Sequence, residues 1–438
     1  MHYARSMTAL SYSSRYDRHD IVHQSIAVSQ ILSVLRRRYP PFTPLFPLLR
    51  RLAINLSQPG WAEDLLPYIP LSNLQFLAIG YDGGRYHHPQ QILGFISRLT
   101  EGVSSLRTMK LKVRSKLEPY ADFFVNSKNF CNLRRIALDC HPALSALTFS
   151  RIAQFPCLQH LTIRLKQEVS RVHESFITLP WLEKLELIVS ETKFAVSFFD
   201  SIKEFPRVAR ISIYIEQILP FKHELEQVSH QLHHLCSPTL LRTLVISFRG
   251  FGTHHMGLPP LMPENPGYTL QTFLPLVTSF SLHVFHLSVQ LPLLPPSSSF
   301  TAKMASAWTD LTSIRIDPGS LIPLDELTTI SFCELIPFFQ TCKRLRRLHI
   351  PFKHSLSDYL PHIEIQAIFM YDLGLGYLSP QSEELLALAR WLRAAMPALP
   401  EVALMGSGGD CKIYNLFELV EDTFSTENDA RGTSSAEV

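Results

Sequence analysis

The sequence predicts an α/β solenoid, with short parallel strands along one face and helices or irregular segments along the other. Three observations predict it. The pattern L-x-x-L-x-L, with Leu, Ile or Val at the marked places, returns along much of the 438-residue chain. Its last two apolar positions alternate with other residues, as in a strand that is buried on one face. Several copies follow a proline, which ends the apolar-periodic stretch in front of them.

Three copies show the repeating unit most clearly: Phe155–Ile163, Leu179–Leu187 and Phe205–Ile213. Each predicts a helix, a proline stop, a short strand and a return loop. A single strand of this length cannot bury its apolar face alone, so the units are expected to stack on one another.

The spacing of the copies also predicts repeats. Four consecutive gaps between Leu106 and Val208 measure 24 to 27 residues, within the roughly 20–29 residues typical of one strand-and-helix repeat. The first apolar residues of the twelve copies are Leu49, Leu74, Leu106, Leu133, Leu158, Leu182, Val208, Leu241, Leu282, Leu311, Leu345 and Leu399.

Helices are expected between the strands and ahead of them. An amphipathic helix at 25–39 precedes the first copy and carries three arginines in its last turn, where cations favour the helix dipole. The later candidates are Gln90–Thr100, Pro142–Gln154, Lys193–Glu204, Glu224–Leu235, Asp325–Thr341 and Pro380–Met396. In the last of these, Ser379 is a candidate N-cap and Pro397 ends the helix.

The predicted organisation is a disordered N-terminus at 1–20, a capping-helix region at 21–44, a repeat array at 45–410, and a C-terminal cap with a disordered tail at 411–438. Longer gaps contain insertions. Arg249–Tyr268 is predicted to be an irregular loop, and 365–370 is a candidate extra strand. Phe273–Leu294 is apolar but interrupted by prolines and histidines, so it predicts two strands and no membrane helix.

Composition and cysteine usage bound the cellular setting. Seven cysteines occur without a C-x-x-C motif, which indicates reduced thiols in the cytosol or nucleus. Residues 1–20 lack the apolar core of a secretory signal. The net charge of the chain is only +3, so charge alone does not favour nucleic acid or a membrane surface.

The repeats resemble degenerate leucine-rich repeats, and more narrowly those of fungal F-box/leucine-rich-repeat proteins. The segments that carry the resemblance are Phe46–Leu49, Phe155–Leu158, Leu179–Leu182, Phe205–Val208 and Met396–Leu399. It covers about residues 45–405 and implies a horseshoe fold and the substrate-receptor part of a ubiquitin ligase. The Asn that common leucine-rich repeats carry after the third apolar residue is missing, which excludes a continuous asparagine ladder. No F-box is visible either, so docking to a Skp-type adaptor stays open.

In such a horseshoe the third, fifth and seventh residues of each copy face the concave side. Nine cations and four anions (Asp139, Glu186, Asp317 and Glu401) fall there, a net charge of +5. The residues predicted to bind a partner are Arg51, Lys110, Lys112, Arg135, His160, Arg164, Lys184, Arg210, Arg315 and Arg347. They indicate an acidic or phosphorylated protein segment. The alternative is that they are solvated strand edges without a ligand.

Three function classes therefore stay open. The first is a non-enzymatic substrate receptor, and the second is a repeat scaffold without a ubiquitin link that binds an acidic protein or nucleic acid. The third, an enzyme with a site assembled across repeats, has no motif in its favour. The histidine pairs at 87–88, 233–234 and 254–255 lack zinc spacing, and Gly406–Asp410 lacks the Lys-Ser/Thr of a phosphate loop. We expect no metal and no cofactor, and further contacts from the loops Tyr81–His88 and Arg249–Tyr268.

Overall fold

The computed structural model divides into two compact units, Met1–Val208 and Ala209–Val438, which are described separately. The residues that the structure describes are 9–11, 34, 37–40, 43, 45–55, 66–81, 98–99, 102–114, 130–141, 146–166, 177–216, 222–248, 268–288, 293–294, 298–317, 332–350, 372–375, 392, 402–405 and 413–415.

The first unit is a ladder of parallel strands, each paired with the next along the chain. The strands are β1 (Ala9–Ser11), β2 (Arg51–Asn55), β3 (Phe76–Tyr81), β4 (Thr108–Arg114), β5 (Arg135–His141), β6 (His160–Leu165) and β8 (Lys184–Val189). From β2 onward, each strand begins two residues after the first apolar residue of a predicted copy. The repeats of this unit are therefore confirmed. β1 lies within 1–20, for which the sequence predicts no strand.

The second unit continues the pattern with β10 (Arg210–Ile215), β11 (Thr243–Phe248), β13 (Val284–Ser288), β15 (Ser313–Asp317), β16 (Arg347–Ile350), β17 (Asp372–Leu375), β18 (Val402–Met405) and β19 (Ile413–Asn415). The pairs from β10 to β18 are parallel, whereas β19 pairs antiparallel with β18. β17 is absent from the twelve predicted copies, and the candidate strand 365–370 lies outside the described residues.

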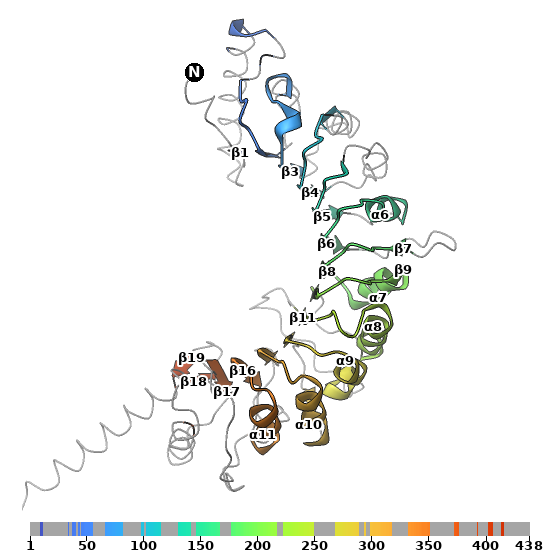
Figure 1. The fold of residues 1–438 in the computed structure, drawn as a ribbon, viewed down its shortest axis with the longest axis vertical. Coiled ribbons are helices and arrows are strands. Elements are labelled where there is room, and N and C mark those ends of the chain that lie inside the picture. Colours follow the sequence, from blue (N-terminus) through green and yellow to red (C-terminus); the bar gives the residue numbers. More distant parts are fainter. Residues whose placement is uncertain are drawn as a thin grey trace, which may run out of the picture. The chain divides into compact units, whose positions relative to one another are not determined.

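Helices and short two-stranded ladders connect the strands, and in each unit the helices lie on one side of the main ladder (Figure 1). The first unit contains the 3₁₀ turns η1 (Leu66–Tyr68) and η2 (Leu71–Asn73), α6 (Ala146–Ala153), β7 (Ile177–Thr178), α7 (Thr192–Asp200) and β9 (Ile202–Glu204). The second contains α8 (Lys222–Leu235), β12 (Tyr268–Thr269), η4 (Leu270–Phe273), α9 (Leu274–Ser279), β14 (Leu293–Leu294), α10 (Ser298–Ala307) and α11 (Phe332–Thr341).

Three of these connections differ from the expectation. The helix predicted at Lys193–Glu204 ends at Asp200, and its last residues form β9, which pairs with β7. Phe273–Leu294 contains α9 as well as β13 and β14, because a proline is compatible with the first turn of a helix. The sequence patterns do not predict α10. Pro180 and Pro206, which are expected to end helices, instead follow the short strands β7 and β9.

The other predicted helices are described to different extents. α6 and α11 confirm the helices expected within Pro142–Gln154 and Asp325–Thr341. α8 confirms the helix expected at Glu224–Leu235 and begins two residues earlier, at Lys222. Only isolated helical residues are described in 25–39, Gln90–Thr100 and Pro380–Met396. The loops Tyr81–His88 and Arg249–Tyr268, apart from their strand residues, and the tail at 425–438 lie outside the described part of the chain.

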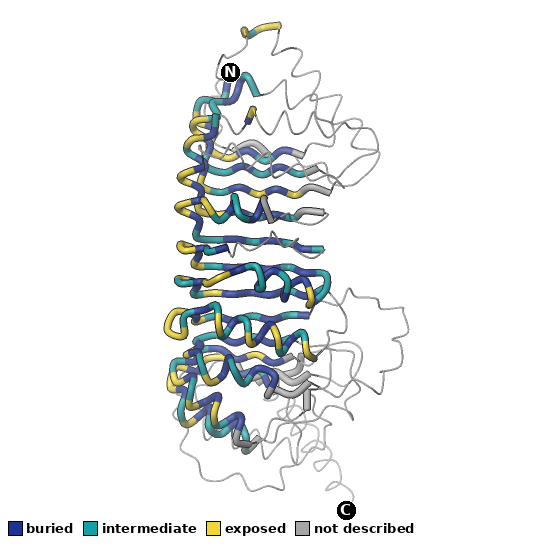
Figure 2. Tube along the Cα trace, turned by 90° about the vertical axis from the view of Figure 1, so that its right-hand side faces the viewer, coloured by how far each residue is buried: buried dark blue, intermediate teal, exposed yellow. Residues whose placement is uncertain are grey.

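The core forms where the apolar residues of successive strands stack. Along β6 and β8 buried residues alternate with partly exposed ones, as Figure 2 shows. Leu161 and Ile163 are each 1% exposed. Phe155 and Phe205, which begin two of the proline-containing copies, are buried as well. Their rings pack edge-to-face against Phe130 and Phe199, with centroids 5.8 and 6.3 Å apart. In these two turns the Phe-Pro signature therefore supplies an aromatic ring to the core.

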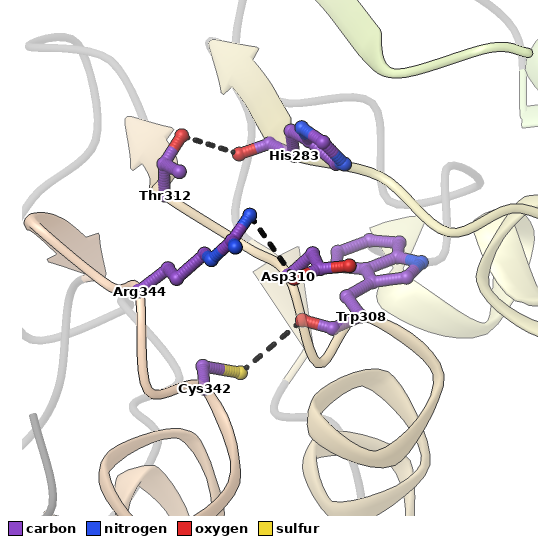
Figure 3. A network of polar contacts seen from close by, with 6 residues as sticks. All are labelled: His283, Trp308, Asp310, Thr312, Cys342 and Arg344. Carbon is purple, nitrogen blue, oxygen red and sulfur yellow. Dashed lines mark hydrogen bonds and ion pairs between the residues drawn. The ribbon is translucent and has the colours of Figure 1, made fainter.

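Polar contacts join successive turns at the start of the strands. In the second unit, Thr312 Oγ1 donates a hydrogen bond to the His283 carbonyl at 2.9 Å, and Arg344 lies 3.5 Å from Asp310 (Figure 3). The buried Cys342 thiol donates to the Trp308 carbonyl at 3.4 Å. These bonds fix the register between repeats, since each one links equivalent turns of neighbouring copies.

Candidate functional site

The candidate site is the open face of the first-unit ladder, where the side chains between the core residues lie. Strand register arranges them in three rows across β2, β3, β4, β5, β6 and β8. The first row is Arg51, Phe76, Thr108, Arg135, His160 and Lys184. The second is Ala53, Ala78, Lys110, Ala137, Thr162 and Glu186. The third is Gly80, Lys112, Asp139, Arg164 and Ile188.

A hollow of about 600 Å³ opens on this face. The polar and aromatic side chains that line it are Arg51, Gln75, Phe76, Arg107, Thr108, Lys110, Arg135, His160, Thr162 and Lys184. We call this lined surface the cationic trough. Lys110, Ala137 and Thr162 line it from the second row, and the last two are small, so the floor is low beside the long side chains of the first row. The trough crosses the strands instead of following one of them.

Phe76 organises two of the cations in the cationic trough. The Arg51 guanidinium carbon lies 4.9 Å from the centroid of the Phe76 ring, and Lys110 Nζ lies 5.8 Å from it. Both distances fall within the range of cation–π attraction, which is about 0.5–1 kcal/mol at exposed sites. Arg51 and Lys110 come from β2 and β4, on either side of the strand that carries the ring. Phe76 therefore restricts both cations without neutralising them.

The charges in the cationic trough are only partly balanced by acidic residues. Lys184 lies 3.7 Å from Glu186 on its own strand, and in the third row Arg164 donates to Asp139 at 3.2 Å. Exposed pairs of this kind typically contribute about 0–1 kcal/mol. Within the described residues, no carboxylate lies at ion-pair distance from Arg51, Lys110 or Arg135. These three cations are available to a ligand.

The pKa of His160 is lowered inside the cationic trough. Partial burial lowers the pKa of its imidazole below the ordinary value, and the charges of Arg135 and Lys184 lower it further, while Glu183 opposes them. The ring is therefore neutral at neutral pH. It lines the trough as a hydrogen-bonding group and not as a further cation.

The open face of the second unit carries fewer of the predicted residues. Its first row reads Arg210, Thr243, Val284, Ser313 and Arg347, and its second reads Ser212, Val245, His286, Arg315 and His349. His286 Nε2 lies 3.0 Å from Ser313 Oγ, so a hydrogen-bonded polar pair occupies part of this face. In these two rows the three arginines lie among Ser, Thr, Val and His side chains.

The structure thus brings together five of the ten predicted contact residues: Arg51, Lys110, Arg135, His160 and Lys184. Lys112 and Arg164 lie one row away, and Arg210, Arg315 and Arg347 lie in the second unit. Sequence reasoning missed Phe76 and Arg107. The signal for Phe76 was its place as the third residue of the copy that begins at Leu74. Arg107 is the second residue of its copy, a position that was not assigned to the concave face.

Other kinds of site find no support in the described part of the chain. It contains no group of three His, Cys, Asp or Glu residues that could hold a metal ion. The pair His233 and His234 lies in the last turn of α8 with ring centroids 5.1 Å apart, whereas the other two histidine pairs are not described. No described helix has the length and hydropathy needed to cross a membrane.

Comparisons with known proteins identify no family for this chain. No protein-family model and no curated protein matches this chain. Two solved structures are similar in fold at low identity. One is TLR13 in its complex with ssRNA13, with 14% identity and a TM-score of 0.34, covering 78% of this chain and 52% of that one. The other is the complex of Rad7 and Elc1 in yeast, with 10% identity, a TM-score of 0.30, and coverage of 92% and 96%.

The chain therefore spans about half the length of the TLR13 chain. The class of protein rests on the geometry itself. Short parallel strands recur at repeat spacing, and helices cover one side of the ladder in each unit. The chain has the leucine-rich-repeat fold.

Proposed function

We propose that this protein is a non-enzymatic interaction scaffold that binds a protein partner through the open face of its repeats. The observation that carries the proposal is the cationic trough. Arg51, Lys110 and Arg135 line one hollow, and no described carboxylate neutralises them. A repeat array exposes such a face over many strands, which suits an extended partner more than a small molecule.

The finer proposal is that the scaffold acts as the substrate-receptor part of an F-box/leucine-rich-repeat ubiquitin-ligase component. It is supported by the Phe-Pro-x-Leu junctions, two of which bury their phenylalanine in the core, Phe155 and Phe205. We propose further that the protein works in the cytosol or nucleus, on the basis of its cysteine content, seven residues without a C-x-x-C motif. Four of these are free thiols in the described residues: Cys131, Cys157, Cys236 and Cys342.

Affinity capture from cells that express the tagged full chain tests the ubiquitin link. The proposal expects reproducible recovery of a Skp-type adaptor and a cullin with the chain. Recovery of other partners without either of these, under identical washing, would remove the ubiquitin link and leave only the scaffold.

The alternative is a scaffold without a ubiquitin link that binds an acidic protein or a nucleic acid, and it rests on the same cations. Nucleic-acid binding would weaken steeply with salt, with a slope set by the number of phosphates that the protein contacts. Replacing Arg135 or Arg347 would then reduce that slope. Binding to a nucleic acid whose slope is unchanged in both variants would exclude the basic face as its site.

A further inference from the structure

We infer that the cationic trough binds an extended, carboxylate-rich segment of a partner protein, which runs across strands β2 to β8 of the first unit. The inference rests on the proposed scaffold function and specifies its ligand and its place.

The cations of the cationic trough are distributed, and they do not converge on one point. Four of them come from β2, β4, β5 and β8, and the fifth, Arg107, directly precedes β4. Neighbouring strands are about 4.8 Å apart. Arg51, Lys110, Arg135 and Lys184 therefore fall at about 0, 10, 14 and 24 Å along the direction of strand stacking. A single phosphate needs several donors within one small cluster. Several separate carboxylates match this spacing better.

The floor of the cationic trough suits an extended chain. Ala137 and Thr162 line the trough, and Ala53 and Ala78 continue the same row on β2 and β3, so a backbone can lie close to the sheet between taller side chains. Crossing about 24 Å takes roughly seven extended residues at about 3.3 Å each. Alternate residues of such a segment point to the same side, which brings three or four acidic side chains toward the cations.

The aromatic content of the face argues against a nucleic acid as the ligand. Proteins that bind single-stranded nucleic acids stack successive bases on several aromatic side chains. In the three rows of the first unit the aromatic rings are Phe76 on β3 and the imidazole of His160 on β6, so they do not form a continuous stack. Arg51 and Lys110 already lie against the Phe76 ring. The ring therefore positions cations for anionic groups and is a poor platform for a base.

Fluorescence anisotropy with the full chain tests the inference. The probe is a labelled ten-residue peptide that alternates Glu and Gly, and three comparison ligands separate the sources of negative charge. They are the Gln–Gly peptide, the Gln–Gly peptide with one phosphoserine, and a ten-nucleotide oligothymidylate. We expect saturable binding of the Glu–Gly peptide that weakens between about 0.05 M and about 0.5 M salt. The Gln–Gly peptide should not bind, and the other two ligands should bind more weakly.

Matched charge reversals locate the site. The triple variant Arg51→Glu, Lys110→Glu, Arg135→Glu should weaken binding of the Glu–Gly peptide about 30-fold or more, since it removes three exposed ion pairs and adds repulsion. The control Arg210→Glu, Arg315→Glu, Arg347→Glu in the second unit should change it less than about threefold. The milder Arg51→Gln, Lys110→Gln, Arg135→Gln guards against loss of folding, which circular dichroism monitors, and should lose about tenfold.

Equal losses in the two charge-reversal variants, or no loss in the first, would overturn the inference. Tighter binding of the phosphopeptide or the oligonucleotide than of the Glu–Gly peptide would overturn it as well. The same variants separate this result from the scaffold function. If the first triple variant still captures the cellular partners of the wild-type chain, the scaffold stands and the trough is not its contact site.

Discussion

The open faces of the two units share one backbone pattern and differ in the side chains that it displays. In both units the strands begin two residues after a buried apolar residue, from β2 to β16, and pair in register. The first unit places Arg51, Lys110 and Arg135 around one hollow. The second separates its arginines and pairs His286 with Ser313. The apolar positions therefore specify the ladder, whereas the residues between them can differ in charge and size from one unit to the other.

The largest expected effect tests the shared framework. Leu161→Asp in the first unit and Leu287→Asp in the second would each bury an unpaired charge among stacked apolar residues. We expect each to lower the free energy of unfolding by about 3–5 kcal/mol. Thr162→Asp, one position along on the open face, should change it by about 0.5 kcal/mol or less. Chemical denaturation measures all three, and an unchanged midpoint for Leu161→Asp would show that its inward assignment is wrong.

The next largest effect is a difference between the two units in how fast their cysteine thiols react. Burial raises the pKa of Cys236 and of Cys342 to about 12, and both lie in the second unit. Cys131 and Cys157, in the first unit, are exposed. A thiolate-directed alkylating reagent at pH 8 should therefore label the first-unit pair roughly 100-fold faster or more. Peptide mapping by mass spectrometry gives the rates, and comparable rates for the two pairs in the folded protein would contradict the burial of the second-unit thiols.

A smaller effect is expected from the ring that holds two cations in the cationic trough. Phe76→Ala leaves the charges of Arg51 and Lys110 in place but removes two contacts of about 0.5–1 kcal/mol each. Affinity for the Glu–Gly peptide should fall about three- to tenfold. Tyr214→Ala, an aromatic truncation on the open face of the second unit, is the control and should have no effect. Wild-type affinity of Phe76→Ala in a titration would mean that the cations need no such support.

The smallest effect concerns pH and His160. Its folded-state pKa lies below the ordinary value of 6.5, so the unfolded chain binds the proton more readily. The stability contributed by neutral His160 is therefore complete above pH 6.5 and declines as the pH falls below it. His160→Gln should flatten that part of the pH profile of the melting temperature. The profiles of wild type and variant should coincide at pH 8, and identical profiles down to pH 5 would contradict the lowered pKa.

The buried side of each repeat could be predicted from the sequence because it follows a local rule. Leu161 and Ile163 alternate with polar residues within one strand, and neighbouring copies repeat the pattern at similar spacing. β17 was not predicted because its copy begins with Met370 and not with Leu, Ile or Val. Met370 lies 25 residues after Leu345, and Leu373 and Leu375 occupy the other two apolar positions of the pattern. α9 was not predicted because Pro275 was interpreted as an interruption of the apolar segment, whereas a proline in the first turn favours a helix.

The cationic trough could be predicted only in part, because it depends on contacts between repeats. Single copies identified Arg51, Lys110 and Arg135 as outward-facing residues. Their alignment along one hollow depends on the register that joins β2 to β5, and a single copy does not reveal that register. The role of Phe76 is non-local for the same reason, since the cations that lie over its ring come from the neighbouring strands. The ion pair of Arg164 with Asp139 likewise links β6 to β5.

A reciprocal charge swap tests the central claim most directly. The variant Arg51→Glu, Lys110→Glu, Arg135→Glu presents carboxylates at the positions of the three cations. If the first-unit face recognises its ligand by charge at this spacing, the variant should bind a labelled Lys–Gly peptide of ten residues that the wild type does not bind. The same swap at Arg210, Arg315 and Arg347 should not create such binding. A folded first-unit variant that binds neither the Lys–Gly nor the Glu–Gly peptide, or equal gains from both swaps, would contradict the account.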